Sequence, residues 1–171
     1  YDFCPYCGFE LADGEEESED FGMLGKNDFL DEEIMADMGG FGMFDKIRRD
    51  FPDRFVNVGV AEQTMMGIGV GLAIEGVVPV VFSMTPFLLY RPFETIRNYL
   101  NRDNIPVKMV GSGRGKDYIN HGFSHWAEED KQVMALFPNI ESYWPENKEE
   151  IAQILDLILA SPKPCYLNLR K

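Results

Sequence analysis

The chain has 171 residues, of which 45% are hydrophobic and 13% aromatic, a composition sufficient for one folded domain with a buried core. Its formal net charge of -13 argues against a nucleic-acid partner, because binding to a phosphate backbone depends on clustered Lys and Arg. None of its apolar runs approaches the length of roughly 18 residues that a helix needs to cross a bilayer, and its first residues lack the basic, apolar and small-residue regions of a signal peptide. We therefore expect a soluble, cytoplasmic protein without a membrane partner.

The acidity is concentrated in the N-terminal segment. Residues 1–50 hold 15 acidic and 4 basic residues, whereas residues 51–171 hold 14 acidic and 12 basic residues. The acidic run over residues 10–27 has little apolar content, which is typical of a solvated tether. We therefore expect a short acidic N-terminal extension over residues 1–27 and a folded domain over residues 28–171.

Two cysteines in this extension form a C-P-x-C-G turn. Cys4 and Cys7 could present two thiolates to a zinc ion, which needs four ligands in a closed structural site. The other ligands could come from Cys165, from the pair His121 and His125, or from the same turn of a second subunit. The alternative is an unmetallated turn, since a lone C-x-x-C is half of a metal-binding signature. Three cysteines give no even disulfide framework, which favours an intracellular protein.

From residue 28 the chain alternates strand-like and helical runs. We expect strands near residues 33–37, 54–58, 77–82, 105–111, 139–144 and 165–169, and helices near residues 43–50, 61–75 and 148–160. Pro86 suits a first helical turn, Pro92 should kink or restart that helix, and Asn147 is a predicted helix N-cap. The alternation predicts an α/β fold with a mostly parallel sheet.

Glu62 begins the predicted helix over residues 61–75, directly after a predicted strand. In open α/β sheets, ligands bind beyond the carboxyl ends of the strands, where helix N-termini also offer free N–H groups. On position alone, the simpler interpretation is that Glu62 complements the helix dipole. The same helix holds Gly67, Gly69 and Gly71, which lower intrinsic helix propensity by up to about 1 kcal/mol each. Such glycines indicate close packing, here against a partner helix.

The run FPDRFVNVGVAEQTMMGIGVGLAIEGVVPVVFSM resembles the pyrimidine-binding domain of transketolase and its relatives, which are thiamine diphosphate enzymes. The resemblance covers about residues 34–170 and implies the three-layer sandwich of the thiamine diphosphate-binding fold. It implies that Glu62 is the glutamate that activates the cofactor. Phe87 falls on the position of the aromatic residue that stacks on the aminopyrimidine ring, and Tyr90 on the aromatic residue one turn later. The alternative for both is a core aromatic at helical spacing. Asp37 matches the end of the family's first strand and is a further cofactor-side candidate.

The segment Gly122-Phe123-Ser124-His125, followed by Glu129-Asp130, resembles the family's substrate loop, in which G-x-T-H precedes an acid pair. His125 matches the histidine that lines the substrate channel. His121 stands where many transketolases carry an acid that meets the sugar hydroxyl, so ketopentose specificity does not follow. Arg114 is a candidate for contact with an acidic or phosphorylated substrate. The alternatives are a structural role for the histidines and a solvated loop for Arg114.

The chain has no convincing diphosphate and magnesium motif, because Asp13-Gly14-Glu15 lacks both the leading glycine and a preceding strand. The resemblance therefore implies a hetero-oligomer in which a separate diphosphate-binding subunit holds Mg²⁺ and shares thiamine diphosphate with this chain. It also implies self-association through the pyrimidine domain. We expect a split transketolase-like enzyme that transfers two-carbon ketol groups between small sugar or keto substrates. The alternatives are a non-catalytic assembly or regulatory module and another thiamine diphosphate enzyme, of the deoxysugar-phosphate synthase or 2-oxoacid type.

Overall fold

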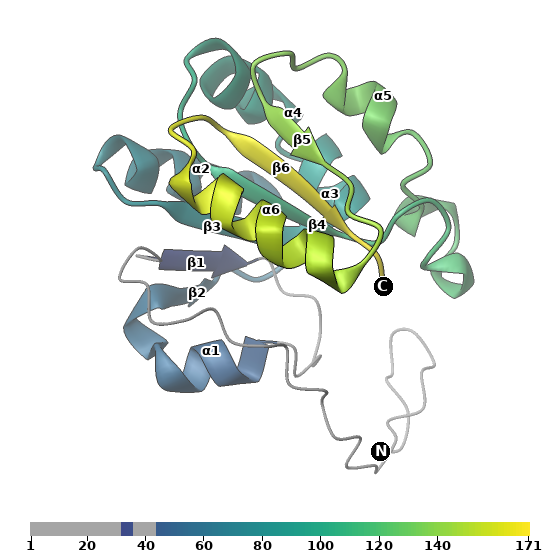
Figure 1. Ribbon diagram of the computed structural model, residues 1–171, viewed down its shortest axis with the longest axis horizontal. Helices are drawn as coiled ribbons and strands as arrows, with labels where there is room; N and C mark the ends of the chain where they lie inside the picture. The colour runs from purple at the N-terminus through teal and green to yellow at the C-terminus, as the bar shows by residue number, and fades with distance from the viewer. Residues whose placement is uncertain (1–31, 36–43) are drawn as a thin grey trace.

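A six-stranded sheet organises the computed structural model, which describes residues 32–35 and 44–171 (Figure 1). The strand order is β2-β1-β3-β4-β6-β5, and each of these pairings is parallel. The strands are β1 (Glu32–Met35), β2 (Phe55–Asn57), β3 (Pro79–Met84), β4 (Lys108–Ser112), β5 (Glu141–Tyr143) and β6 (Cys165–Leu169). The predicted α/β fold with a mostly parallel sheet is confirmed.

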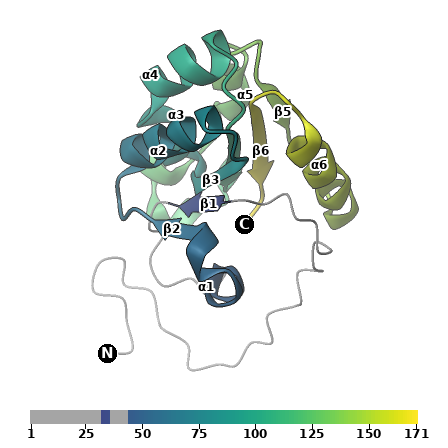
Figure 2. The ribbon, with the colours of Figure 1, turned by 90° about the vertical axis from the view of Figure 1, so that its left-hand side faces the viewer.

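Helices cover both faces of this sheet (Figure 1, Figure 2). One face carries α2 (Glu62–Ile74), α3 (Thr85–Tyr90), α4 (Phe93–Thr95), the π-helical segment η3 (Ile96–Arg102) and α5 (Asp130–Met134). The other face carries α1 (Asp45–Asp50) and α6 (Lys148–Ala160). Short 3-10 turns are η2 (Pro52–Arg54), η4 (Ile119–His121) and η5 (Phe123–His125).

Each face of the sheet has its own core, because successive residues of a strand point to opposite sides. Val81, Met109 and Tyr166 pack with the buried side chains of α2 and α3. Phe82 and Leu167, each next to one of these residues in its strand, pack on the opposite side with α6. The predicted three-layer sandwich is therefore confirmed.

The predicted boundaries of helices and strands agree best with the structure where a local sequence signal sets them. The helix over residues 148–160 has its predicted bounds, and Asn147 Oδ1 accepts a hydrogen bond from Glu150 N at 2.9 Å, as expected of an N-cap. Pro92 separates α3 from α4. The strand expected over residues 77–82 instead begins at Pro79, because Val77 N donates to Leu72 O at 3.1 Å and belongs to the turn that ends α2.

Within the described ranges, none of the helices combines the length and the apolar character that crossing a bilayer requires. The Cys4 and Cys7 turn, the acidic run over residues 10–27, and Asp37 lie outside the described residues. The predicted boundary between residues 27 and 28 lies there too and stays a prediction.

Candidate active site

The predicted site residues gather beyond the carboxyl ends of neighbouring parallel strands. Met84 of β3 is in register with Ser112 of β4, which is in register with Leu169 of β6, so these strands end side by side. The helix α3 follows β3, and the loop over residues 113–129 follows β4. Side chains from both segments therefore meet above the same edge of the sheet, where open α/β sheets bind their ligands.

Glu62 reaches this edge from the first turn of α2. The chain turns between β2 and α2 at Gly59, whose φ of 70° is strained for any other residue and whose N–H donates to Asn57 Oδ1 at 2.9 Å. This turn directs the Glu62 side chain toward β3, where Ser83 Oγ donates to Glu62 Oε1 at 3.4 Å. The side chain is only 2% exposed. A carboxylate so buried needs a paired cation or several hydrogen-bond donors.

Arg91 supplies that cation. Its Nη1 donates to Glu62 Oε2 at 2.5 Å, and its Cζ lies 4.1 Å from the centroid of the Phe87 ring. Arg91 follows Phe87 by four residues and is the C-cap of α3, so both side chains lie on one side of that helix. The predicted residues Glu62 and Phe87 thus meet through one planar guanidinium. Arg91 was not expected from the sequence, although its spacing from Phe87 was a usable signal.

The two histidines continue this cluster from the loop after β4. The rings of Phe87 and His125 have centroids 5.0 Å apart, and those of His125 and His121 are 5.1 Å apart. Ser124 Oγ and His125 Nδ1 are within hydrogen-bond distance at 2.9 Å. Burial lowers the pKa of His125, and the neighbouring His121 and Arg91 lower it further, which favours the neutral imidazole.

His121 has a buried ring nitrogen without a partner. Its Nδ1 is one of two buried side-chain polar atoms in the described part of the chain that make no hydrogen bond, the other being Nε1 of Trp126. A buried polar atom without a partner costs about 1–3 kcal/mol. Such an atom beside His125 is available to a bound oxygen or nitrogen.

Tyr90 lies at the rim of this cluster. Its hydroxyl donates to Glu129 Oε1 at 2.6 Å, and its side chain is among the exposed aromatics. Burial and the adjacent Glu129 carboxylate raise the pKa of Tyr90, so the phenol stays protonated. Tyr90 therefore connects α3 to the acid pair that ends the loop.

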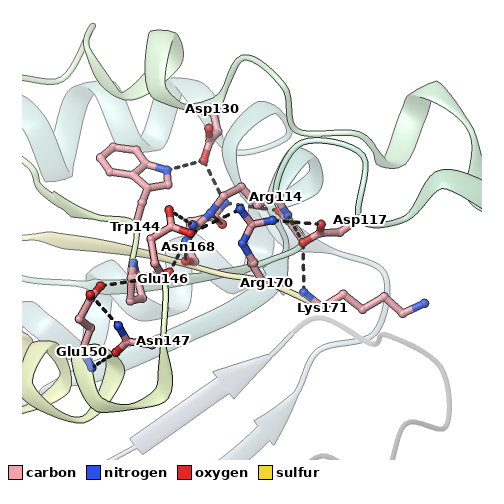
Figure 3. Close-up of polar contacts among 12 residues, drawn as sticks. Arg114, Asp117, Asp130, Trp144, Glu146, Asn147, Glu150, Asn168, Arg170 and Lys171 are labelled. Carbon is pink, nitrogen blue, oxygen red and sulfur yellow. Dashed lines mark hydrogen bonds and ion pairs between the residues drawn. The ribbon is translucent and has the colours of Figure 1, made fainter.

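Arg114, a predicted substrate contact, points into the domain. Its Nε donates to Asn168 Oδ1 at 3.1 Å, and its Nη2 donates to Pro145 O at 2.9 Å and Asn168 O at 2.8 Å (Figure 3). Its Nη1 pairs with Glu146 Oε1 at 2.9 Å. These contacts favour a structural role, in which Arg114 ties the start of the loop to the end of β6, over the substrate contact expected from the sequence.

Beneath the loop, Asn168 and Asp130 form a buried polar pair (Figure 3). Asn168 Nδ2 donates to Asp130 Oδ2 at 2.9 Å and lies 3.1 Å from Thr85 Oγ1, the first residue of α3. Asp130 Oδ2 also accepts from Trp144 Nε1 at 2.6 Å. The pair joins β6, α3 and α5 and so holds both segments that carry the site. The sequence marked Asp130 only as part of the acid pair, and Asn168 carried no signal.

The described residues contain no group of three or more His, Cys, Asp and Glu side chains that could hold a metal ion. Cys165, one candidate for the remaining zinc ligands, is fully buried at the start of β6, where its Sγ lies 3.9 Å from Lys108 Nζ. Burial raises the pKa of this thiol, which disfavours the thiolate that zinc binds.

Comparisons with known proteins agree with this fold. The family described as transketolase, pyrimidine binding domain, matches residues 30–171. An apulose-4-phosphate transketolase subunit of Actinobacillus succinogenes is 34% identical over 136 residues, 80% of this chain and 44% of that protein. A 6-deoxy-6-sulfo-D-fructose transketolase subunit of Clostridium sp. strain MSTE9 is 31% identical over 134 residues, 78% of this chain and 42% of that protein.

One solved structure is described as a split gene transketolase, inactive beta4 tetramer. It matches with a TM-score of 0.71 and 29% sequence identity, over 81% of this chain and 44% of that chain. This chain thus spans less than half the length of the proteins just compared.

Proposed function

The chain belongs to the family of transketolase pyrimidine-binding domains, and on this premise we propose that it is a subunit of a split, thiamine diphosphate-dependent transketolase-like enzyme. In this enzyme the chain binds the aminopyrimidine half of the cofactor, and a separate subunit binds the diphosphate and Mg²⁺. The reaction is the transfer of a two-carbon ketol group between small sugar or keto substrates. The observation that carries the proposal is that the buried Glu62 carboxylate and the face of Phe87 both contact the one guanidinium of Arg91.

The residues fit the cofactor because they already hold a group of similar shape. Glu62 accepts a hydrogen bond from the planar Arg91 guanidinium, which packs on Phe87. An aminopyrimidine is likewise flat, and its edge carries an amino group that donates and ring nitrogens that accept. Glu62 would hold the proton at a ring nitrogen, and Phe87 would stack on the ring, an interaction of about 0.5–1.5 kcal/mol beyond area burial. When bound, thiamine diphosphate supplies the carbon nucleophile of the reaction.

We assign His125 and His121 to the substrate side of the site. The lowered pKa of His125 favours its neutral form at neutral pH, which can donate to or accept from a substrate hydroxyl or carbonyl oxygen. The unpartnered Nδ1 of His121 gains a partner if a substrate oxygen binds there. Tyr90 and Asp37 are further cofactor-side candidates, with Tyr90 at the rim of the cluster.

A second copy of this chain is our proposed partner for the exposed face of α2. A Cβ added at Gly67 or Gly71 would meet nothing within 4 Å, whereas one at Gly69 would lie 2.9 Å from Val81 Cγ1. Packing within the chain therefore explains only Gly69. Two further glycines lower helix propensity by up to about 1 kcal/mol each, and the close approach of another backbone would explain them. The tetramer named for the related split gene structure supports a second copy as the occupant.

Two metal assignments complete the proposal. Mg²⁺ belongs to the diphosphate-binding partner, because its ligands are normally carboxylates together with phosphate oxygens. Cys4 and Cys7 are candidate zinc ligands, and the same turn of a second copy would supply the other two thiolates of a closed site.

Activity of the complex containing this chain tests the role of Glu62. Native mass spectrometry of the protein purified from its source should find a second chain, thiamine diphosphate and a divalent ion. In that complex, Glu62→Gln should lower kcat for ketol transfer by about 10²- to 10⁴-fold. Glu75→Gln is the matched control, since Glu75 is exposed at the other end of α2. Full activity of an intact Glu62→Gln complex would refute the assignment, and a 2-oxoacid donor would place the chain in another branch of thiamine enzymes.

A further inference from the structure

We propose that Arg91 is a built-in competitor for the cofactor half-site. Its guanidinium occupies the place proposed for the aminopyrimidine, and the cofactor binds only when Arg91 leaves. This inference rests on the proposed roles of Glu62 and Phe87 and adds a residue that sets the affinity of their site.

One side chain makes both contacts that the aminopyrimidine would need. Arg91 Nη1 lies 2.5 Å from Glu62 Oε2, and Arg91 Cζ lies 4.1 Å from the centroid of the Phe87 ring. A guanidinium is planar and donates N–H groups from its edge. An aminopyrimidine is also planar, with an amino group that donates and ring nitrogens that accept. It therefore satisfies the carboxylate and covers the aromatic ring at the same time.

The two groups cannot occupy the site together. Glu62 is 2% exposed, with Ser83 Oγ 3.4 Å from Oε1 and Arg91 Nη1 on Oε2. The face of Phe87 under the guanidinium has no room for a second flat group at van der Waals distance, because stacked groups need about 3.5–4.0 Å between their atoms. Binding of the ring is thus an exchange of partners for Glu62 and Phe87.

The pair is built for such an exchange because its members differ in exposure. The Arg91 side chain is 41% exposed and can turn into solvent without unpacking a core, whereas Glu62 stays buried. A buried carboxylate that loses its partner is strongly destabilised. Arg91 therefore keeps Glu62 paired until the ring replaces it, with a proton then shared between the Glu62 carboxyl group and a ring nitrogen.

The competition raises the apparent dissociation constant of the cofactor in inverse proportion to the fraction of time that the pair is open. If Arg91 covers the site about nine-tenths of the time, the apparent dissociation constant is about tenfold higher than that of the open site. Removing the guanidinium should lower the apparent dissociation constant by the same factor.

Calorimetric titration of the full chain with 4-amino-5-hydroxymethyl-2-methylpyrimidine tests the exchange. This probe carries the aminopyrimidine without the thiazolium and diphosphate, so binding does not require the partner subunit. We expect Arg91→Gln to bind it about tenfold more tightly than the wild type. Arg97→Gln is the control, because Arg97 is exposed on the segment after α4 and bonds to Asn98, and it should match the wild type.

A second measurement does not depend on how well Arg91→Gln folds. In the wild-type chain labelled with ¹⁵N-arginine, the Arg91 guanidinium signals should differ from those of exposed arginines and move toward them as the probe is added. Equal or weaker probe affinity for folded Arg91→Gln, with binding lost in Glu62→Gln, would overturn the competition and leave the proposed function standing. Absence of binding to both the wild type and Arg91→Gln would overturn both.

Discussion

The three glycines of α2 should respond to alanine in opposite ways. Gly69 faces the core, where a Cβ would lie 2.9 Å from Cγ1 of the fully buried Val81 and 3.5 Å from Cγ1 of Val107. Overpacking of this kind costs about 1–3 kcal/mol, which outweighs the gain in helix propensity of about 1 kcal/mol. Gly69→Ala should therefore lower the free energy of unfolding by up to about 2 kcal/mol.

Gly67→Ala and Gly71→Ala should instead stabilise the single chain. A Cβ at either position meets nothing within 4 Å, so only the propensity gain of up to about 1 kcal/mol each remains. The same methyl groups should weaken self-association, because they hold a second helix away from the α2 backbone. The chain would thus become more stable alone and less associated.

Two assays separate these effects. Urea denaturation at low protein concentration measures the stability of the single chain, because association would add a concentration-dependent term. Sedimentation at higher concentration measures the association constant. Wild-type stability of Gly69→Ala would refute the packing described for α2 against β3. An unchanged association constant for Gly67→Ala together with Gly71→Ala would refute α2 as the self-association face.

Three further predictions concern single side chains. Burial, the neighbouring His121 and Arg91 hold the pKa of His125 below its ordinary 6.5, so NMR titration should find the imidazole neutral at pH 7. Arg91→Gln should raise the pKa of His125. Because the pKa of His125 is lower in the folded chain than in the unfolded chain, the free energy of unfolding should fall as the pH drops below 6.5. A His125→Gln variant that lost stability over the same pH range would contradict this. Asp130→Ala removes the acceptor of the buried Asn168 amide and of the half-buried Trp144 indole, and it should cost about 2–4 kcal/mol by urea denaturation. A cost under about 1 kcal/mol would show that these donors find other partners. Asn147→Ala should cost about 1 kcal/mol in the same assay, with Asn147→Ser near wild type, and equal losses for both would argue against capping.

Local signals in the sequence were sufficient for much of the fold. The cap at Asn147 and the helical period after it set the bounds of α6, since both act within a few residues. Pro92, which lacks an N–H, accounts for the break between α3 and α4. The strand-to-helix junction at Glu62 was visible from the change in residue type, and the resemblance to transketolase domains added the expected role of that carboxylate.

Contacts between distant residues were decided by the tertiary structure alone. Glu62 and Arg91 are 29 residues apart, and Arg114 and Asn168 are 54 apart. Neither pair has a local pattern, because each forms only where parallel strands bring their carboxyl ends together. The sequence by itself determined which elements form, where a carboxylate and an aromatic ring stand, and which family the chain resembles. The packing of the sheet decided that Arg91 covers Glu62 and Phe87 and that Arg114 points inward, since partner choice depends on positions in space.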